Sequence, residues 1–446
     1  MKLKNSYSDA KIASSRVAFA RQGFEGRVTI PPSKSYLHRI LICAFLSENE
    51  VVIEGKSACA DVQATVSCLN SLGADIQETD DGYRVRGGAA AFSEKQNKEI
   101  VLDCNESGST LRFLLPLAAS LGGGITLSGS YRLGERPNAA LIKELNRHGA
   151  DISLTFPFVI KGKLRSGDYV LPGNISSQYI TGLLLTLPLL EGDSSLTVTT
   201  EILSAPYVDI TLEVLEMFGV KIQKDGNKFL INGAQKYTRA EPVFAEGDWS
   251  SASFWLVAGA VCGNIEIEGL NLDSKQGDKR VLQIIKDAGG CVEIMKEENR
   301  EFIRVKSGAI KPFEVDINEI PDTAPALAVL AIAARGRCVL RGAERLKDKE
   351  CDRLAALIEN LKRLGVKAFT ETGKELVVDS KRIYKRKYNI ELFGRNDHRI
   401  VMSAAIATAA IDNAVVVTDE DAVNKSYPEF WEDFRNLTVP IGDLFI

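Results

Sequence analysis

The sequence predicts a mixed α/β protein of two domains, each made of three similar units. The chain has 446 residues, which is long enough for at least two domains. Two sequence signatures each recur at intervals of about 70 to 76 residues along the chain. Internal repeats of this kind indicate one structural unit used several times, so they are the first guide to the fold.

The first signature is a helix that ends in glycine and is followed by a strand. Its glycines are Gly73, Gly149, Gly219, Gly289 and Gly365, and they are 76, 70, 70 and 76 residues apart. A glycine directly after a helix adopts the left-handed backbone conformation that ends it. The signature therefore places the end of an amphipathic helix and the start of a strand in each unit. Residues 209–218 show the helical pattern clearly, with apolar side chains on one face.

The second signature is an apolar helix, a short turn and a strand that ends near glycine. These helices begin near Ser35, Ser109, Gln178, Ser250, Thr323 and Asp397. Small and apolar residues surround each of them almost completely, which indicates buried helices. The chain thus reads as about six units, each with one buried helix, one surface helix and several strands. Six units divide into two domains of three, with a boundary near residues 245–248.

The composition argues against several classes of protein, namely nucleic-acid-binding, metal-binding, secreted and membrane proteins. There are 55 Lys and Arg residues and 59 Asp and Glu residues, so the formal net charge of −4 argues against a general nucleic-acid-binding protein. Three histidines, and eight cysteines without a Cys-x-x-Cys pair, make a structural metal site unexpected. The N-terminus has no signal-peptide core, and the longest apolar runs are shorter than a membrane span. We expect a cytoplasmic, soluble protein with free thiols.

The starts of the buried helices carry unexpected charges. Lys34 and Arg39 lie in the first turns of the first helix, Arg112 in the second and Arg399 in the last. A cation there opposes the helix dipole and is mildly unfavourable unless an anion binds nearby. Capping by one Ser, Thr or Asp per helix explains residues such as Ser250 but not these cations. The pattern therefore predicts sites for anionic ligands.

Other charged segments are less specific. Residues 131–137 hold two arginines, residues 346–353 mix both signs, and residues 423–428 contain Lys425. A solvated surface explains each of these segments as well as a binding site does.

Taken together, the motifs resemble those of the 3-phosphoshikimate 1-carboxyvinyltransferase (EPSP synthase) family. The resemblance extends over nearly the whole chain. Its motifs, in order, are Ser33-Lys34-Ser35 with Arg39, residues 107–112, Glu135-Arg136-Pro137, Ser176-Ser177-Gln178, Ser204 with Pro206-Tyr207, residues 246–248, Ile320-Pro321-Asp322, Lys349-Glu350 with Asp352-Arg353, residues 396–399 and Lys425. The complete ordered set is far more specific than any one of these motifs.

The resemblance implies a two-domain inside-out α/β barrel, in which each domain has three βαβαββ repeats. The helix N-termini would face the cleft between the domains. Residues 30–246 would form the N-terminal domain, and residues 1–29 with 247–446 the C-terminal domain. The implied reaction transfers the enolpyruvyl group of phosphoenolpyruvate to the 5-hydroxyl of shikimate 3-phosphate in the shikimate pathway, which leads to chorismate and the aromatic amino acids. No cofactor or metal is implied, and we expect a monomer without nucleic-acid or membrane partners.

The resemblance also implies roles for individual residues. Phosphoenolpyruvate would be held by Lys34, Gly108, Arg136, Gln178, Arg353, Arg399 and Lys425. Shikimate 3-phosphate would be held by Lys34, Ser35, Arg39, Ser176, Ser177, Gln178, Ser204, Tyr207, Asp322, Arg345 and Lys349. Asp322 is expected to act as the base near the hydroxyl and Glu350 as the acid near the methylene carbon, with assistance from Lys34. Three roles are open for His398: a contact to a phosphate, the orientation of Arg399, or a structural role only.

Two alternatives remain open at the level of sequence. UDP-N-acetylglucosamine 1-carboxyvinyltransferase uses the same donor, but that family carries a Lys-Asn pair where this chain has Lys34-Ser35, and a cysteine in the loop at residues 130–136, which here has none. A non-catalytic anion-binding protein would not need Asp322 and Glu350.

Two residues differ from the family pattern. Glu106 and Arg345 stand where some family members have Asn. The resemblance further implies that Gly108 leaves room for phosphoenolpyruvate and for the inhibitor glyphosate, of which we expect this protein to be a target.

Overall fold

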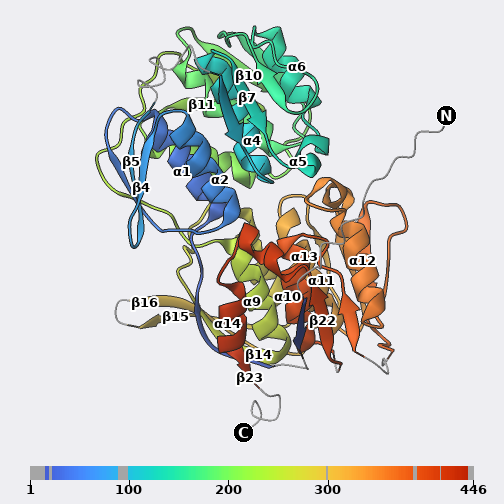
Figure 1. The fold of residues 1–446 in the computed structure, drawn as a ribbon. Coiled ribbons are helices and arrows are strands. Elements are labelled where there is room, and N and C mark those ends of the chain that lie inside the picture. Colours follow the sequence, from blue (N-terminus) through green and yellow to red (C-terminus); the bar gives the residue numbers. More distant parts are fainter. Residues whose placement is uncertain are drawn as a thin grey trace, which may run out of the picture.

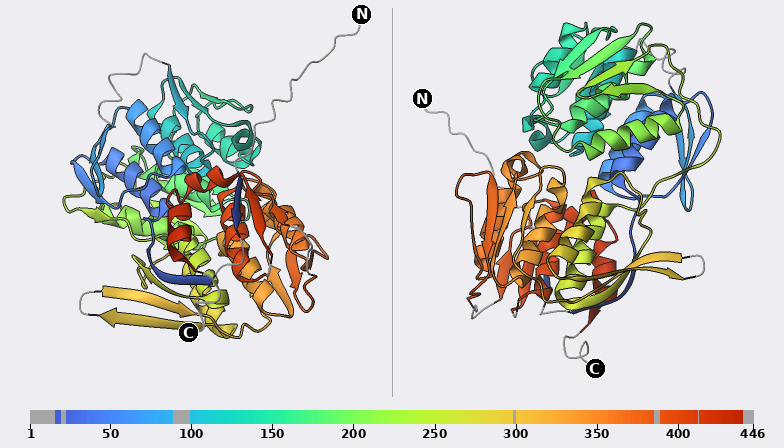
Figure 2. Two further views of the ribbon diagram at one scale, coloured as in Figure 1. Left: turned by 60° about the horizontal axis from the view of Figure 1, so that its bottom comes forward. Right: turned by 180° about the vertical axis from the view of Figure 1, so that it is seen from behind.

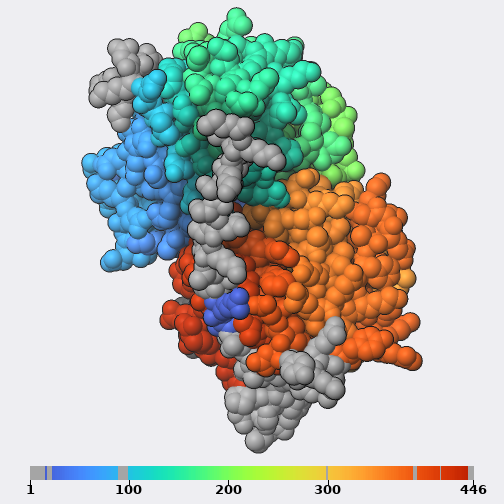
Figure 3. Space-filling view, turned by 45° about the vertical axis from the view of Figure 1, so that its right-hand side comes forward, coloured from blue at the N-terminus to red at the C-terminus, as the bar shows by residue number. Residues whose placement is uncertain are grey.

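The computed structural model describes residues 16–19, 23–88, 99–297, 300–384, 389–411 and 413–439. Figure 1 shows two halves, one above the other. The N-terminal half contains the elements from α1 to β13, and the C-terminal half contains β1, β2 and the elements from α9 to β23. In the space-filling view the halves form two masses, one coloured blue to green and the other orange to red (Figure 3).

The N-terminal half alternates helices with short strands. Its elements are α1 (Lys34–Leu46), β3 (Val51–Glu54), α2 (Ala60–Ser71), β4 (Asp75–Glu78), β5 (Gly82–Arg86), β6 (Ile100–Asp103), α4 (Gly108–Leu121), β7 (Ile125–Ser128), α5 (Tyr131–Glu135), α6 (Ala139–Arg147), β8 (Phe158–Ile160), β9 (Asp168–Leu171), α7 (Ser177–Leu184), η2 (Leu187–Leu189), β10 (Ser194–Val198), α8 (Pro206–Met217), β11 (Ile222–Asp225), β12 (Lys228–Ile231) and β13 (Val243–Phe244).

The C-terminal half follows the same alternation. Its elements are β1 (Arg16–Phe19), β2 (Gly23–Thr29), α9 (Trp249–Cys262), β14 (Gly263–Glu268), η3 (Gly277–Arg280), α10 (Val281–Asp287), β15 (Cys291–Glu297), β16 (Arg300–Lys306), β17 (Glu314–Asp316), η4 (Pro321–Thr323), α11 (Ala324–Ala333), β18 (Arg337–Arg341), η5 (Glu344–Asp348), α12 (Arg353–Arg363), β19 (Lys367–Phe369), β20 (Glu375–Asp379), β21 (Ile390–Leu392), α13 (His398–Ile406), η6 (Ala407–Ala409), β22 (Val415–Thr418), η7 (Glu420–Lys425), α14 (Phe430–Leu437) and β23 (Thr438–Val439). The β15–β16 hairpin extends away from this half (Figure 2).

One sheet pattern occurs six times in the described residues. In each sheet two parallel strands lie side by side, and one of them pairs on its other edge with an antiparallel strand. The order β17, α11, β18, α12, β19, β20 shows a complete unit, with β17 parallel to β18 and β18 antiparallel to β20. Parallel neighbours need a crossover connection, and the buried helix provides it. The fold is therefore a mixed α/β structure built from repeated βαβαββ units.

Three units take a strand from a distant part of the chain. In the first unit β13 pairs in parallel with β3, and in the fourth β2 pairs in parallel with β14. The chain passes between the halves at both places, and these two passages run side by side. The amide of Ser33 donates to the carbonyl of Glu246, and the amide of Asp248 donates to the carbonyl of Pro31. β1 pairs with β22, so it also packs with the C-terminal half.

The buried apolar side chains form two separate clusters. One cluster belongs to the elements from α1 to β13, and the other to β2 and the elements from α9 onward. Helices α9 and α11 are enclosed on nearly every side, as the sequence predicts for helices without a polar face. Burial of this much apolar surface is the main source of stability for each half.

The repeated glycines end their helices as predicted. Gly73, Gly149, Gly219, Gly289 and Gly365 follow α2, α6, α8, α10 and α12, with φ angles of 111°, 94°, 78°, 93° and 82°. Side chains rarely tolerate positive φ, so glycine is needed there. The glycine ends the surface helix and turns the chain into the next strand.

In the part of the chain that the structure describes, no helix combines the length and the apolar character needed to cross a bilayer. Likewise, no group of three or more His, Cys, Asp or Glu side chains among these residues could hold a metal ion. Six of the eight cysteines are buried.

Candidate active site

The starts of all six buried helices meet at one cavity between the two halves. Its lining includes the first residues of α1, α4, α7 and α13, the N-cap of α9, and Asp322 in the turn that leads into α11. Each helix start has free backbone N–H groups and the positive end of the helix dipole. Six such ends directed at one cavity favour an anionic occupant.

Nearly all the predicted site residues line this central cavity. They are Lys34, Ser35, Arg39, Gly108, Arg136, Ser176, Ser177, Gln178, Ser204, Tyr207, Asp322, Arg345, Lys349, Glu350, Arg353 and Arg399. Lys425 does not line it. Instead, Lys425 lines a small adjoining cavity together with Arg136 and Glu350, which border both spaces. The complete predicted set is thus gathered in one region.

Two buried arginines point to anion binding most directly. Arg39 donates to the hydroxyls of Thr181 and Thr211 and to backbone carbonyls, and Arg112 donates to Asn138, Gln178 and a carbonyl. Neither forms an ion pair with any residue that the structure describes. Burial lowers the pKa of Arg39 to about 10 and, with the nearby charge of Arg136, that of Arg112 to about 9. Both remain charged at neutral pH, and a buried unpaired cation calls for an anion.

Lys34 is paired with a carboxylate that the sequence analysis overlooked. Its ammonium lies 2.8 Å from Asp61 Oδ2 at the start of α2, and both side chains are mostly buried. Burial alone would lower the pKa of Lys34, but the charges of Asp61 and Glu350 and the hydrogen bond to Asp61 together outweigh this effect, and the pKa is raised. Lys34 is therefore held in its charged form at the edge of the central cavity.

On the side of the central cavity formed by the C-terminal half, Arg353 forms ion pairs with three carboxylates. Its guanidinium contacts Asp397 at 2.7 Å, Glu350 at 2.6 Å and Asp322 at 2.8 Å, and its side chain is almost fully buried. Asp397 also caps α13 by accepting from the amide of Arg399. Bidentate and charge-assisted contacts of this kind fix a guanidinium in one orientation.

The two carboxylates with predicted catalytic roles are surrounded by cations. Burial would raise the pKa of Asp322, but Arg399, Lys349 and Arg353 hold it well below its usual range. Burial acts on Glu350 in the same way, and Arg353 and the other nearby cations lower its pKa well below normal. Both groups are ionised at neutral pH in this structure. An acid role for Glu350 therefore requires that a bound anion first offset the surrounding positive charge.

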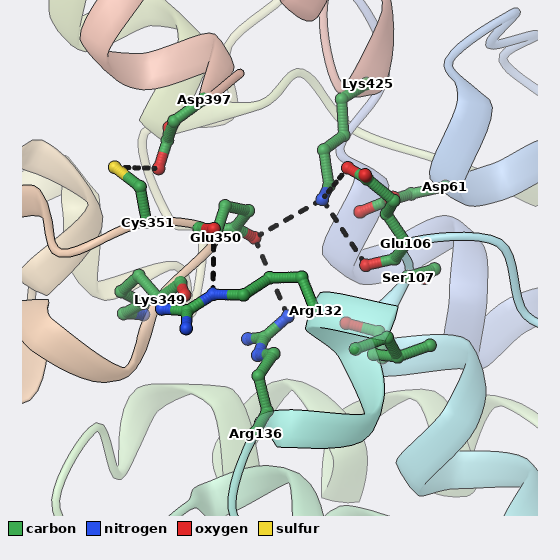
Figure 4. A network of polar contacts seen from close by, with 12 residues as sticks. Asp61, Glu106, Ser107, Arg132, Arg136, Lys349, Glu350, Cys351, Asp397 and Lys425 are labelled. Carbon is green, nitrogen blue, oxygen red and sulfur yellow. Dashed lines mark hydrogen bonds and ion pairs between the residues drawn. The ribbon is translucent and has the colours of Figure 1, made fainter. Parts of the chain in front are cut away.

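Several contacts cross between the halves near Glu350 (Figure 4). Arg132 on α5 donates to the backbone carbonyls of Lys349 and Glu350. Arg136 lies 3.9 Å from Glu350, and Lys425 lies 3.3 Å from Glu106. The loop that carries Lys349 and Glu350 is therefore held from the N-terminal half as well as from its own half.

Hydroxyl and amide groups cover the side formed by α7 and α8. Ser176 caps α7 by accepting from the amide of Gln178, whose side chain contacts Arg112 and Ser109. Ser204 has a φ of 60° and accepts a hydrogen bond from Arg345 at 3.0 Å. These groups suit a ligand that carries several hydroxyls beside a phosphate.

The expected cap at Ser250 is wrong. The N-cap of α9 is Asp248, which accepts from the amide of Ser251, whereas the Ser250 hydroxyl donates to Asp278. Asp248 also faces the central cavity, which the sequence analysis did not foresee. The Gly-Asp pair before the apolar run was the available signal, because Asp is as good a cap as Ser.

His398 opens α13 and lines the central cavity. It is 1% exposed, and neither ring nitrogen has a hydrogen-bond partner among the described residues. Burial and the charges of Arg399 and Lys34 lower the pKa of His398 well below its normal value. The ring is therefore neutral and can donate one hydrogen bond to a ligand.

Comparison with known proteins gives a consistent result. The sequence model of the EPSP synthase (3-phosphoshikimate 1-carboxyvinyltransferase) family matches residues 20–434. A protein of Clostridium beijerinckii named 3-phosphoshikimate 1-carboxyvinyltransferase is 39% identical over 421 residues, which cover 92% of this chain and 95% of that protein. A protein of Clostridium kluyveri with the same name is 41% identical over 419 residues, covering 93% and 95%.

Solved structures show the same fold. EPSP synthase from Acinetobacter baumannii superimposes with a TM-score of 0.76 at 24% identity, covering 95% of this chain and 98% of that one. The enolpyruvyl transferase NikO from Streptomyces tendae gives a TM-score of 0.72 at 17% identity, covering 95% and 99%. The family match over most of the sequence and the two clostridial relatives show that the chain belongs to the EPSP synthase family.

Proposed function

We propose that this protein transfers the enolpyruvyl group of phosphoenolpyruvate to the 5-hydroxyl of shikimate 3-phosphate, releasing phosphate. The observation that carries the proposal is the meeting of six helix starts, a set of buried cations and two carboxylates at one cavity. Both substrates are polyanions, so this charge distribution suits them. The names of the closely similar clostridial proteins give the same reaction.

The donor is proposed to lie between the two halves, against Gly108. Phosphoenolpyruvate carries a carboxylate and a phosphate close together, and bidentate Arg with point-charge Lys suits both groups. The donor set is Lys34, Gly108, Arg136, Gln178, Arg353, Arg399 and Lys425. Because this set draws on both halves, donor binding would hold them together and exclude water from the reacting atoms.

The acceptor is proposed to lie on the side lined by α7 and α8. The hydroxyls of Ser176, Ser177 and Ser204 suit a phosphate, and buried Arg39 adds charge. Lys349 and Asp322, which are 3.1 Å apart, would contact the ring hydroxyls. Ser35, Gln178, Tyr207 and Arg345 complete the acceptor set, and Lys34 is shared with the donor.

The chemistry is an addition followed by an elimination. In the addition, the 5-hydroxyl oxygen bonds to the second carbon of phosphoenolpyruvate, Asp322 takes the hydroxyl proton, and Glu350 gives a proton to the methylene carbon. In the elimination, the bond between the second carbon and the phosphate oxygen breaks, the methyl carbon returns a proton to Glu350, and phosphate leaves with the proton that Asp322 holds. Donor anions bound to Arg353, Arg136 and Lys425 would offset their charge and raise the pKa of Glu350 toward the range of a proton donor.

The same proposal includes the finer features of the fold. The two halves are assigned as domains at residues 30–246 and at residues 1–29 with 247–446, each wound as an inside-out α/β barrel. Residues 1–15 and 20–22 lie outside the described residues. A monomeric state and a cytoplasmic location stay predictions.

Product analysis tests the function. The protein is incubated with phosphoenolpyruvate and either shikimate 3-phosphate or UDP-N-acetylglucosamine, and released phosphate and product mass are measured. We expect phosphate release and an enolpyruvyl adduct with shikimate 3-phosphate alone. Turnover with the UDP-sugar would assign the chain to the related reaction, and no turnover with either acceptor would reject transferase activity.

A further inference from the structure

Lys425 is held by a carboxylate from the opposite half. Its ammonium is 3.3 Å from Glu106 Oε2 and donates to the Glu106 backbone carbonyl at 3.3 Å. Glu350 Oε1 lies 4.0 Å away (Figure 4). The Lys425 side chain is 9% exposed, so its charge is directed at these groups rather than at solvent. The ammonium thus has a negatively charged partner before any donor anion reaches it.

Glu106 reaches a second residue of the C-terminal half. Its Oε1 accepts from Asn396 Nδ2 at 3.4 Å, just before α13. Glu106 itself lies two residues before α4, whose first residue is Gly108. It also lines the small adjoining cavity with Arg136, Glu350 and Lys425. One carboxylate therefore contacts two segments of the C-terminal half, Lys425 at the end of η7 and Asn396 just before α13, beside the proposed donor site.

We propose that Glu106 is a specificity-determining residue of the donor site, where its carboxylate competes with the anionic groups of the donor for Lys425. This inference rests on the proposed function and on the assignment of Lys425 to the donor. A donor anion near Lys425 meets the negative charge of Glu106 and must share or displace it. Glu106 therefore lowers the affinity of the site for every small anion that depends on Lys425.

The strength of this competition follows from the location of the carboxylate. The Glu106 side chain is 35% exposed, so solvent and salt screen it in part, whereas the ammonium of Lys425 is shielded. Removal of the negative charge without a change of shape should therefore tighten donor binding, and the gain should shrink as ionic strength rises. A purely structural role for Glu106 would give neither effect.

The test compares Glu106→Gln with the parent protein. Gln has the shape of Glu and can still contact Asn396 and Lys425, so melting curves should match within a few degrees. We expect the KM for phosphoenolpyruvate to fall on the order of fivefold at low salt, with the KM for shikimate 3-phosphate unchanged. At high salt the difference should disappear. If Glu106→Gln does not fold, Glu106→Ala is measured in the same way.

Glu48→Gln serves as the matched control. Glu48 pairs with Lys236 at 2.8 Å on the surface, both side chains are more than half exposed, and Glu48 follows the end of α1 that points away from the central cavity. This variant makes the same charge change and should leave both KM values at the parent level.

The outcomes separate this inference from the proposed function. If the parent makes no product from the two substrates, the proposed function fails. If the parent is active but Glu106→Gln has an equal or higher KM for phosphoenolpyruvate, the competition by Glu106 is refuted and the function stands. An equal fall in Glu48→Gln would also refute it, because the effect would then be one of net charge.

Discussion

Gly108→Ala tests the proposed donor site through one methyl group. A Cβ built on Gly108 would lie 2.6 Å from Nη1 and 2.9 Å from Cζ of Arg136. Ordinary contact begins near 3.4 Å, so the guanidinium would have to withdraw by about 0.8 Å. The guanidinium of Arg136 can move because it is the far end of a flexible side chain. Its new location, however, would no longer match the donor.

The size of the effect follows from the contacts of Arg136. Its side chain is 9% exposed and lies 3.9 Å from Glu350, so the displaced charge moves within a confined space. Misalignment of one charge-assisted hydrogen bond costs about 1.5–3 kcal/mol. We therefore expect the KM for phosphoenolpyruvate to rise about 10-fold to 100-fold. The KM for shikimate 3-phosphate should change little, because its proposed contacts lie on another wall.

Steady-state kinetics with glyphosate as competitor complete this test. Glyphosate has one more chain atom between its carboxylate and its phosphorus than phosphoenolpyruvate has, so it needs the space at Gly108 more. Its inhibition constant should rise by a larger factor than the KM for phosphoenolpyruvate. Equal losses for the two molecules, or no loss for either, would refute the placement of the donor against Gly108.

Three further substitutions test other parts of the site. Asp322→Asn should lower kcat by about 10²–10⁴-fold, as loss of a general base does, and kcat within tenfold of the parent would reject that role. Asp61→Asn removes a negative charge that raises the pKa of Lys34, so Lys34 should lose its proton at lower pH. In the pH profile of kcat/KM, the alkaline limb should therefore move to lower pH. An unchanged alkaline limb would count against Lys34 as the titrating group. Asp397→Asn removes the carboxylate charge that accepts two hydrogen bonds from the buried guanidinium of Arg353 and should cost about 3–5 kcal/mol, seen as a fall in Tm of about 5–15 °C; a Tm within 2 °C of the parent would show that the ion pair contributes little.

Much of the fold could be predicted because local rules decided it. Gly149 and Gly219 end their helices with positive φ, and only glycine does this without strain. The apolar character of α11 around its whole circumference required burial. The pairings of β2 with β14 and of β13 with β3 could not be derived from local pattern, because the paired strands are far apart in the sequence. In addition, β13 is only two residues long.

The same distinction applies to the site: residues with a local sequence signal could be predicted, and residues that depend on contacts between distant segments could not. The cations Arg39 and Arg112 stood out because their helix position is unfavourable without an anion, and this signal is local. Asp61 and Glu106 gave no such signal, because an acid near a helix start is normal. Their importance comes from contacts with Lys34 and Lys425 that the fold creates between distant segments.

A crystal structure of the protein with shikimate 3-phosphate and glyphosate would test the central claim most directly. The account predicts both ligands in the central cavity, with the acceptor phosphate against Ser176 and Ser177 and the anionic ends of glyphosate against Lys34, Arg136 and Arg399. The helix starts would then surround the bound anions. Ligands bound outside this cavity, or anions that contact none of these residues, would contradict it.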